Sequence, residues 1–144
     1  MKKFKGLTLT ELMITVVILG IIAGYGIPNF TTAIERGHRR DAENQLKAVY
    51  AANYIYRAQN SNLFWPTTGT NQFAATINAT LSTNIIENGK IFQCRGVVAG
   101  TSFTCEACRN NCVTPDWTVR ITEAILSGAN PTCIDGTKSC PTFN

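Results

Sequence analysis

The sequence has little charge and few groups that could carry out chemistry. Only 15% of its 144 residues are charged, against roughly 25% in an average soluble domain. It has a single histidine, His38, which stands among arginines and is interpreted as a surface group. There is no glycine-rich phosphate loop, and the acidic residues are too scattered to form an acid/base pair. We therefore expect no enzymatic activity, no cofactor and no metal site. Hydrophobic residues still make up 44% of the chain, which argues against a disordered protein.

The few charges are unevenly placed. The formal net charge is +4, and Lys2, Lys3 and Lys5 supply three of these positive charges. No residue from 12 to 27 is charged. The stretch 7–27 has 21 residues, and as a helix it would extend roughly 32 Å, close to the thickness of a bilayer core. Basic residues before it predict a cytoplasmic N-terminus, with the rest of the chain outside.

Three interpretations of this apolar stretch compete. A helix that is apolar on all sides would need a larger protein to bury it. A cleaved secretory signal would have a small-x-small cleavage site after the apolar run, and this sequence has none there. A retained membrane segment fits best, and its unusual feature is Glu11, because an ionisable group in such a segment is costly. Glu11 either lies at the headgroup level near Lys5 or, if the chain is cut after Gly6, pairs with the new amino group of Leu7.

The start of the chain carries a recognisable pattern. A short basic leader is followed by Gly6, then Leu7-Thr8-Leu9, then Glu11, and then the long apolar stretch. This pattern resembles the leader and processing site of type IV pilins and the related pseudopilins. The resemblance implies that a prepilin peptidase cuts between Gly6 and Leu7 and N-methylates Leu7. It also implies that Glu11 neutralises the Leu7 amine of a neighbouring subunit during assembly. Leu7 stands where the family usually has Phe, and Thr10 where it usually has an apolar residue.

The resemblance also implies an organisation in four parts and an α+β fold. These are a cleaved leader (1–6), an apolar helix for the membrane and later the filament core (7–28), an amphipathic helix entering the globular domain (29–59), and a disulfide-stapled head with an αβ-loop and a C-terminal loop (60–144). Gly24, Gly26 and Pro28 weaken the helix, and by resemblance this region is a kink. In such a fold the long helix packs on a small antiparallel sheet.

Periodicity predicts the elements beyond residue 28. Apolar residues recur at helical spacing up to about Ala58; they are Phe30, Ala33, Ile34, Ala42, Leu46, Val49, Tyr50 and Tyr54. Opposite charges at i,i+4 predict the ion pairs Glu35/Arg39 and Arg39/Glu43. Residues 90–98, 101–107 and 117–125 are predicted strands. Residues 64–89 are predicted to be a loop with a short helix near 73–81.

All six cysteines lie after residue 93, in the part predicted to be outside the cytoplasm, so they are interpreted as disulfides. Six cysteines allow 15 pairings. A tight turn at Ala99-Gly100 would place Cys94 opposite Cys105, within bonding distance. Cys108–Cys112 and Cys133–Cys140 would then close small loops, and the last pair resembles the C-terminal loop of many type IV pilins. A zinc site built from the first four cysteines is the alternative, although their spacing is irregular for one.

Three classes of function follow. The first is a structural subunit of a type IV pilus, single-pass in the inner membrane before assembly and then part of an extracellular surface filament. Its partners would be other copies in a helical homopolymer, the prepilin peptidase, the inner-membrane assembly machinery and membrane lipid. The Cys133–Cys140 pair favours a pilus subunit over a type II secretion pseudopilin, and Glu11 favours a major over a minor pilin. The second class is a signal-anchored extracytoplasmic binding module, which leaves Gly6 and Glu11 unexplained. An enzyme is the third.

Overall fold

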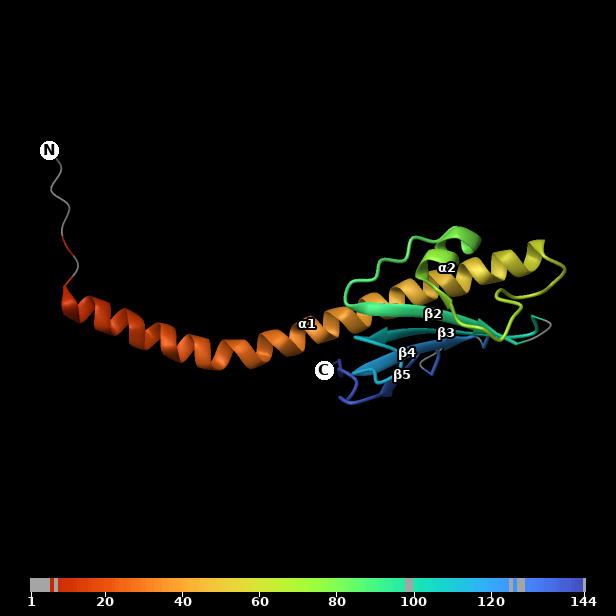
Figure 1. Cartoon of the computed structure of the whole chain (residues 1–144). Coiled ribbons are helices and arrows are strands. Elements are labelled where there is room, and N and C mark those ends of the chain that lie inside the picture. Colours follow the sequence, from red (N-terminus) through yellow and green to blue (C-terminus); the bar gives the residue numbers. More distant parts are fainter. Residues whose placement is uncertain (1–5, 7, 98–99, 125, 127–128, 144) are drawn as a thin grey trace, which may run out of the picture.

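The computed structural model describes residues 6, 8–97, 100–124, 126 and 129–143, without the side chains of 25–29. A long helix leads into a small head, and the first half of this helix projects away from the head (Figure 1). The elements follow the order α1 (Leu9–Gln59), β1 (Gln72–Phe73), α2 (Ala74–Leu81), β2 (Lys90–Gly96), β3 (Phe103–Arg109), β4 (Trp117–Thr122) and β5 (Thr132–Asp135). The α+β class predicted from the sequence is confirmed.

Helix α1 begins where its sequence provides a cap. Thr8 is the N-cap and Glu11 the third helical residue, and their side chains form a reciprocal capping box. The helix continues without a break to Gln59 and curves gently along its length (Figure 1). The residues expected to form a kink, Gly24, Gly26 and Pro28, all lie within the helix.

Across the described residues, we find no helix with enough length and apolar character to cross a membrane. The predicted stretch 7–27 includes Leu7 and the side chains of residues 25–27, which lie outside the description.

The head is a five-stranded antiparallel sheet in the order β1-β2-β3-β4-β5. The second half of α1 and the short α2 pack on one face of this sheet. The buried core between the helices and the sheet takes residues from both. Its members include Leu46 and Val49 of α1, Ile77 of α2, and Phe92, Phe103, Trp117, Val119 and Ile121 of the sheet. This continuous core makes the head a folded unit into which the projecting part of α1 does not enter.

Strand boundaries differ from the prediction for identifiable reasons. β2 ends at Gly96, where the backbone oxygen of Pro66 comes so close that only glycine fits. β4 ends at Thr122, whose backbone N–H and C=O both bond the Asn130 side chain. Two strands were not predicted: β1, which has 2 residues, and β5, which has 4. Both are too short to show the alternation that predicts a strand.

The amphipathic part of α1 buries a narrower stripe than its periodicity predicts. Ala42, Leu46 and Val49 are buried, but Phe30 and Ile34 are exposed because they precede the contact with the head. The stripe also includes a polar residue, Asn53, which is fully buried. Its side-chain amide donates to the Trp65 carbonyl at 2.6 Å and accepts from the Trp65 N–H at 2.9 Å. Asn53 thereby anchors the loop that follows α1.

One of the two predicted ion pairs is wrong. Arg39 and Glu43 pair at 2.8 Å, as expected. Glu35 does not pair with Arg39, because its carboxylate is bound instead by Arg109 on β3, also at 2.8 Å. The long-range partner prevails because it comes from the packed sheet.

The head holds three disulfides: Cys94–Cys105, Cys108–Cys112 and Cys133–Cys140. These are the pairs that the sequence analysis set out. Cys94 lies directly opposite Cys105 in the β2–β3 register. With every cysteine in a disulfide, none is a thiolate ligand for zinc. The described part of the chain also lacks any cluster of three or more His, Cys, Asp or Glu that could hold a metal ion.

Candidate functional site

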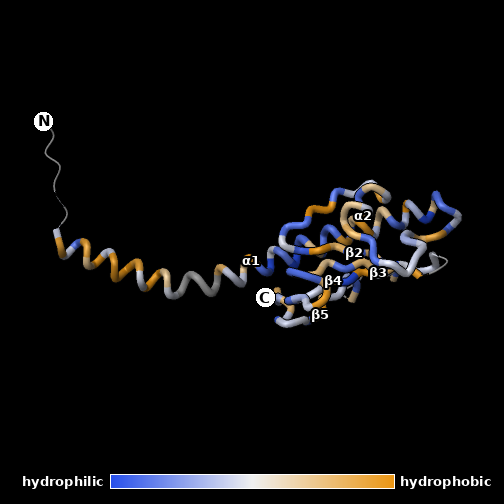
Figure 2. Tube along the Cα trace, viewed as in Figure 1, coloured by the Kyte–Doolittle hydropathy of each residue, from blue (hydrophilic) through white to orange (hydrophobic). Residues whose placement is uncertain are grey.

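The projecting half of α1 is an apolar surface on which no described residue of the head is packed. Ten large apolar side chains along it are 50% to 78% exposed; they are Leu9, Leu12, Met13, Ile14, Val16, Val17, Ile18, Leu19, Ile21 and Ile22. Figure 2 shows this half as mostly hydrophobic, whereas hydrophobic and hydrophilic residues are mixed in the head. Because consecutive helical residues are about 100° apart, this run covers the whole circumference of the helix. Such a helix requires an apolar environment, supplied by lipid or by other helices.

The N-terminal end of this apolar helix carries one carboxylate. Glu11 is the single charged residue from position 9 to position 34. Its Oε2 accepts hydrogen bonds from the Thr8 backbone N–H at 2.8 Å and from the Thr8 hydroxyl at 2.7 Å. The Glu11 N–H in turn donates to the Thr8 hydroxyl oxygen at 3.3 Å. The carboxylate is thus folded back over the first turn, close to where residue 7 joins the chain.

The residues predicted to be processed lie just beyond this cap. Gly6 is exposed, and a Cβ added to it would meet nothing within 4 Å. Leu7 lies outside the described residues, so cleavage between the two stays a prediction. The structure does bring Thr8 into contact with Glu11, a contact that the sequence analysis did not name. The signal for it was present, because Thr-x-x-Glu before an apolar run is a capping-box pattern.

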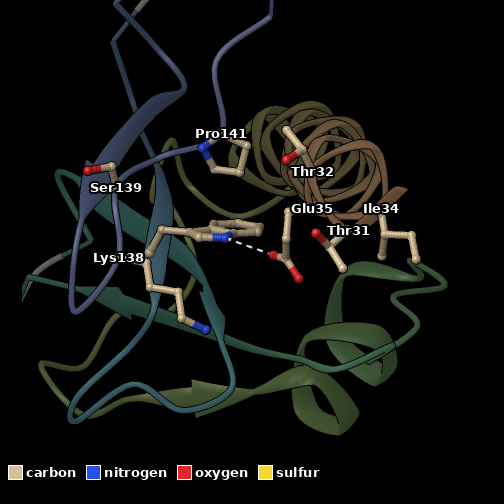
Figure 3. Close-up of a pocket in the computed structure, with 8 residues that line it drawn as sticks. Thr31, Thr32, Ile34, Glu35, Lys138, Ser139 and Pro141 are labelled. Carbon is tan, nitrogen blue, oxygen red and sulfur yellow. Dashed lines mark hydrogen bonds between the residues drawn. The ribbon is translucent and has the colours of Figure 1, made fainter. Parts of the chain in front are cut away.

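A second feature is a groove of about 450 Å³ where α1 enters the head. Figure 3 shows Thr31, Thr32, Ile34 and Glu35 of α1 on one side of it and Lys138, Ser139 and Pro141 of the C-terminal segment on the other. Trp117, at the start of β4, also lines the groove. The groove joins the end of the exposed apolar helix to the head. Sequence reasoning missed it because its two walls are about a hundred positions apart.

Glu35 forms a wall of this groove and ties α1 to the sheet. Its carboxylate accepts two hydrogen bonds from Arg109, at 2.8 and 3.2 Å. It accepts a third from the Trp117 indole N–H, at 3.1 Å, drawn as the dashed line in Figure 3. The Arg109 hydrogen bonds, helped by that of Trp117, hold the pKa of Glu35 below its ordinary 4.5, although partial burial acts in the opposite direction. His38, one turn along the helix, is half-buried, and desolvation lowers its pKa.

This arrangement predicts an acid-sensitive head. Because the folded pKa of Glu35 is depressed, its contribution to stability is present above about pH 4.5 and is lost as the pH falls through the lower folded value. We expect the urea midpoint, followed by tryptophan fluorescence in uncharged detergent, to fall between about pH 7 and about pH 3.5. The fall should be smaller in Glu35→Gln, which cannot ionise. An equal fall in both proteins would show that Glu35 contributes nothing to the acid sensitivity.

Comparison with known proteins agrees with the motif and the fold. Residues 1–26 match the prokaryotic N-terminal methylation motif. The chain is 48% identical over 48 residues to the type IV major pilin protein PilA of Myxococcus xanthus, which is 33% of this chain and 22% of that protein. It is 35% identical over 68 residues to the type II secretion system core protein G of Klebsiella pneumoniae, 47% of each chain. For the Vibrio cholerae protein of the same name, the identity is 38% over 68 residues, 47% of this chain and 45% of that one.

These matches span between about a fifth and a half of the length of the relatives. No solved structure matches the chain significantly. The methylation motif and the α+β fold define the class: a chain made with a class III leader. The motif and the similarity to a pilin and to secretion-system core proteins support a place in the type IV pilin family, taken broadly to include the secretion pseudopilins. The relatives named above are a pilin and two secretion-system proteins, and none of these names denotes an enzyme.

Proposed function

We propose that the chain is a structural subunit of a type IV pilus, processed after Gly6 by a prepilin peptidase and polymerised into a surface filament. One observation supports this most strongly. The projecting half of α1 is apolar and exposed on all sides, and it bears a single carboxylate near its N-terminus. The buried core of the head contains no residue of this half. A binding module that never polymerises needs the apolar anchor but has no use for that carboxylate.

Before assembly, the apolar half of α1 would lie in the inner membrane, with Lys2, Lys3 and Lys5 on the cytoplasmic side and the head outside. Lipid would cover the ten exposed apolar side chains. The assembly machinery would then move the subunit into a helical homopolymer. There the same side chains pack against those of neighbouring α1 helices, so helix–helix contact replaces lipid contact.

Glu11 would set the axial register of that packing. Cleavage after Gly6 creates a positively charged amine at Leu7, and the Glu11 carboxylate lies at the same end of the helix, held by Thr8. In the low dielectric of a filament core, an unpaired carboxylate or amine is costly. A neighbouring subunit that presents its Leu7 amine to Glu11 is therefore favoured over one that is displaced along the axis.

The C-terminal loop supports a pilus subunit in particular. The Cys133–Cys140 loop is followed by a tail that binds α1: the Arg39 guanidinium donates to the Pro141 carbonyl at 2.5 Å. The guanidinium carbons of Arg39 and Arg40 lie 4.4 and 4.7 Å from the centre of the Phe143 ring. The family resemblance implies a disulfide-closed loop of this kind at the C-terminus of pilins.

A type II secretion pseudopilin is the second candidate. It is favoured by the longer matches to the core G proteins, which cover 68 residues against 48 for the pilin. The location of the assembled chain distinguishes the two candidates, because only a pilus subunit is expected in an extracellular surface filament.

Processing gives the first test. We expect the mature chain to begin at Leu7 and to carry one added N-methyl group, as read by intact mass spectrometry. Gly6→Leu should retain residues 1–6, because a bulky side chain replaces the exposed glycine at the cut. Electron microscopy of sheared surface material should show filaments containing the chain. A mature N-terminus at Met1 would instead support the signal-anchored binding module, and processed chain that forms no surface filament would support the pseudopilin.

A further inference from the structure

The outer face of the sheet, turned away from α1, carries a small polar pocket of about 190 Å³. Residues from three strands and one loop line it: Asn71, Gln93, Arg95, Thr104, Glu106 and Arg120. They alternate with the core residues of β2, β3 and β4, and so face away from the core. The pocket lies outside the apolar helix and the groove described above, and the proposed assembly does not use it.

The hydrogen bonds within this pocket engage both oxygens of the Glu106 carboxylate and leave arginine donors free. Glu106 accepts from Gln93 Nε2 at 3.0 Å on one carboxylate oxygen and from Arg120 Nε at 2.6 Å on the other. The Gln93 side-chain oxygen accepts from Asn71 at 2.9 Å. The terminal nitrogens of Arg120 remain available. So does the whole guanidinium of Arg95, which is exposed and forms no ion pair within the described part of the chain.

The register places the two arginines on either side of β3. Arg95 is opposite Thr104, and Arg120 is opposite Glu106, so the guanidiniums reach the pocket from two strands, and Thr104 of the strand between them also lines it. One carboxylate against two guanidiniums leaves the pocket with one net positive charge. Guanidinium forks match the geometry of carboxylate, sulfate and phosphate.

We propose that this pocket binds one small oxyanion, with Arg95 and Arg120 as its main ligands and the Thr104 hydroxyl as a third donor. Its volume is below the roughly 300–1,000 Å³ of sites for drug-sized molecules, so the bound group is a single oxyanion and not a large ligand. Glu106 acts as a positioning residue, because its hydrogen bonds hold Arg120 and Gln93 in place. Oxyanion binding in this pocket does not require assembly into a filament, so it is independent of the proposed function.

The test titrates inorganic phosphate into the full chain in uncharged detergent, at constant ionic strength set with chloride. The readout is the chemical shift of the Nε–H resonances of the arginine side chains. We expect saturable shifts at Arg95 and Arg120 with a dissociation constant in roughly the millimolar range, as for a few exposed charge-assisted hydrogen bonds. Acetate in a parallel titration shows whether the pocket prefers a planar or a tetrahedral oxyanion.

Variants at Arg95 separate charge from geometry. Arg95→Gln should weaken phosphate binding about tenfold, and Arg95→Lys should weaken it less, because it keeps the charge but loses the fork. Lys47→Gln is the matched control, since it removes an exposed charge on α1 outside the pocket. Circular dichroism checks that each variant is folded, as expected at exposed positions. Shifts that do not saturate, or an equal loss in Lys47→Gln and Arg95→Gln, would overturn the proposal.

Discussion

Surface filaments should become at least about tenfold scarcer when Glu11 is replaced by alanine, while cleavage after Gly6 continues. The variant removes the single carboxylate of the apolar half of α1, so the Leu7 amine of a neighbour has no opposite charge in the filament core. It also removes half of the capping box with Thr8, worth about 1 kcal/mol of helix stability. Quantifying the chain in sheared fractions, with intact mass spectrometry of the cellular chain, measures assembly and processing separately.

Two further variants separate the charge from the cap. Glu11→Gln keeps an oxygen that can accept from Thr8 but has no charge, so it should assemble as poorly as Glu11→Ala. Thr15→Val is the matched control. The Thr15 hydroxyl donates to the Leu12 carbonyl of the same helix at 2.8 Å, so its loss should stay local. If Glu11→Gln assembles like the parent chain, the register does not depend on the charge. If Thr15→Val fails as well, the defect is general to polar changes in this helix.

The head should lose about 2–3 kcal/mol of unfolding free energy when Asp41 is replaced by alanine. The Asp41 carboxylate binds the Lys90 ammonium at 2.8 Å, and the Lys90 side chain is completely buried whereas that of Asp41 is 47% exposed. Without Asp41, this buried charge keeps one neutral partner, the Asn88 carbonyl at 3.2 Å. A buried ion left without its counter-charge costs far more than an exposed pair is worth. Urea unfolding at neutral pH measures the loss.

Lys90→Met is the decisive comparison. It removes the buried charge and keeps an apolar side chain of similar length, so it should change the unfolding free energy by less than about 1 kcal/mol. The double variant should be more stable than Asp41→Ala alone, because no unpaired buried charge remains. Glu43→Gln removes the charge that pairs with Arg39, but the Arg39 guanidinium stays 20% exposed and keeps the Pro141 carbonyl as an acceptor, so this variant should cost under about 1 kcal/mol. If Asp41→Ala costs no more than Glu43→Gln, the Lys90 charge is satisfied without Asp41.

Features that depend on residues close in sequence were predicted well. The short helix α2, three strands and the opposition of Cys94 to Cys105 all depend on local spacing. A capping box joins residues three positions apart, and a hairpin sets its own register once its turn is placed. Where such signals were too short, as in β1 and β5, the prediction failed.

The amino-acid sequence by itself thus determined the class of protein, because leader, glycine, glutamate and apolar helix lie in one continuous segment whose chemistry depends on its order. Only the tertiary structure decided which distant groups meet. Glu35 pairs with Arg109 across 74 positions and Lys90 with Asp41 across 49, and the polar pocket gathers residues 71 to 120. The sequence shows that these groups carry charge but not which partner each will find. That choice follows from how α1 packs on the sheet, since burial makes an unpaired charge costly and leaves each group only the partners that the packing brings within reach.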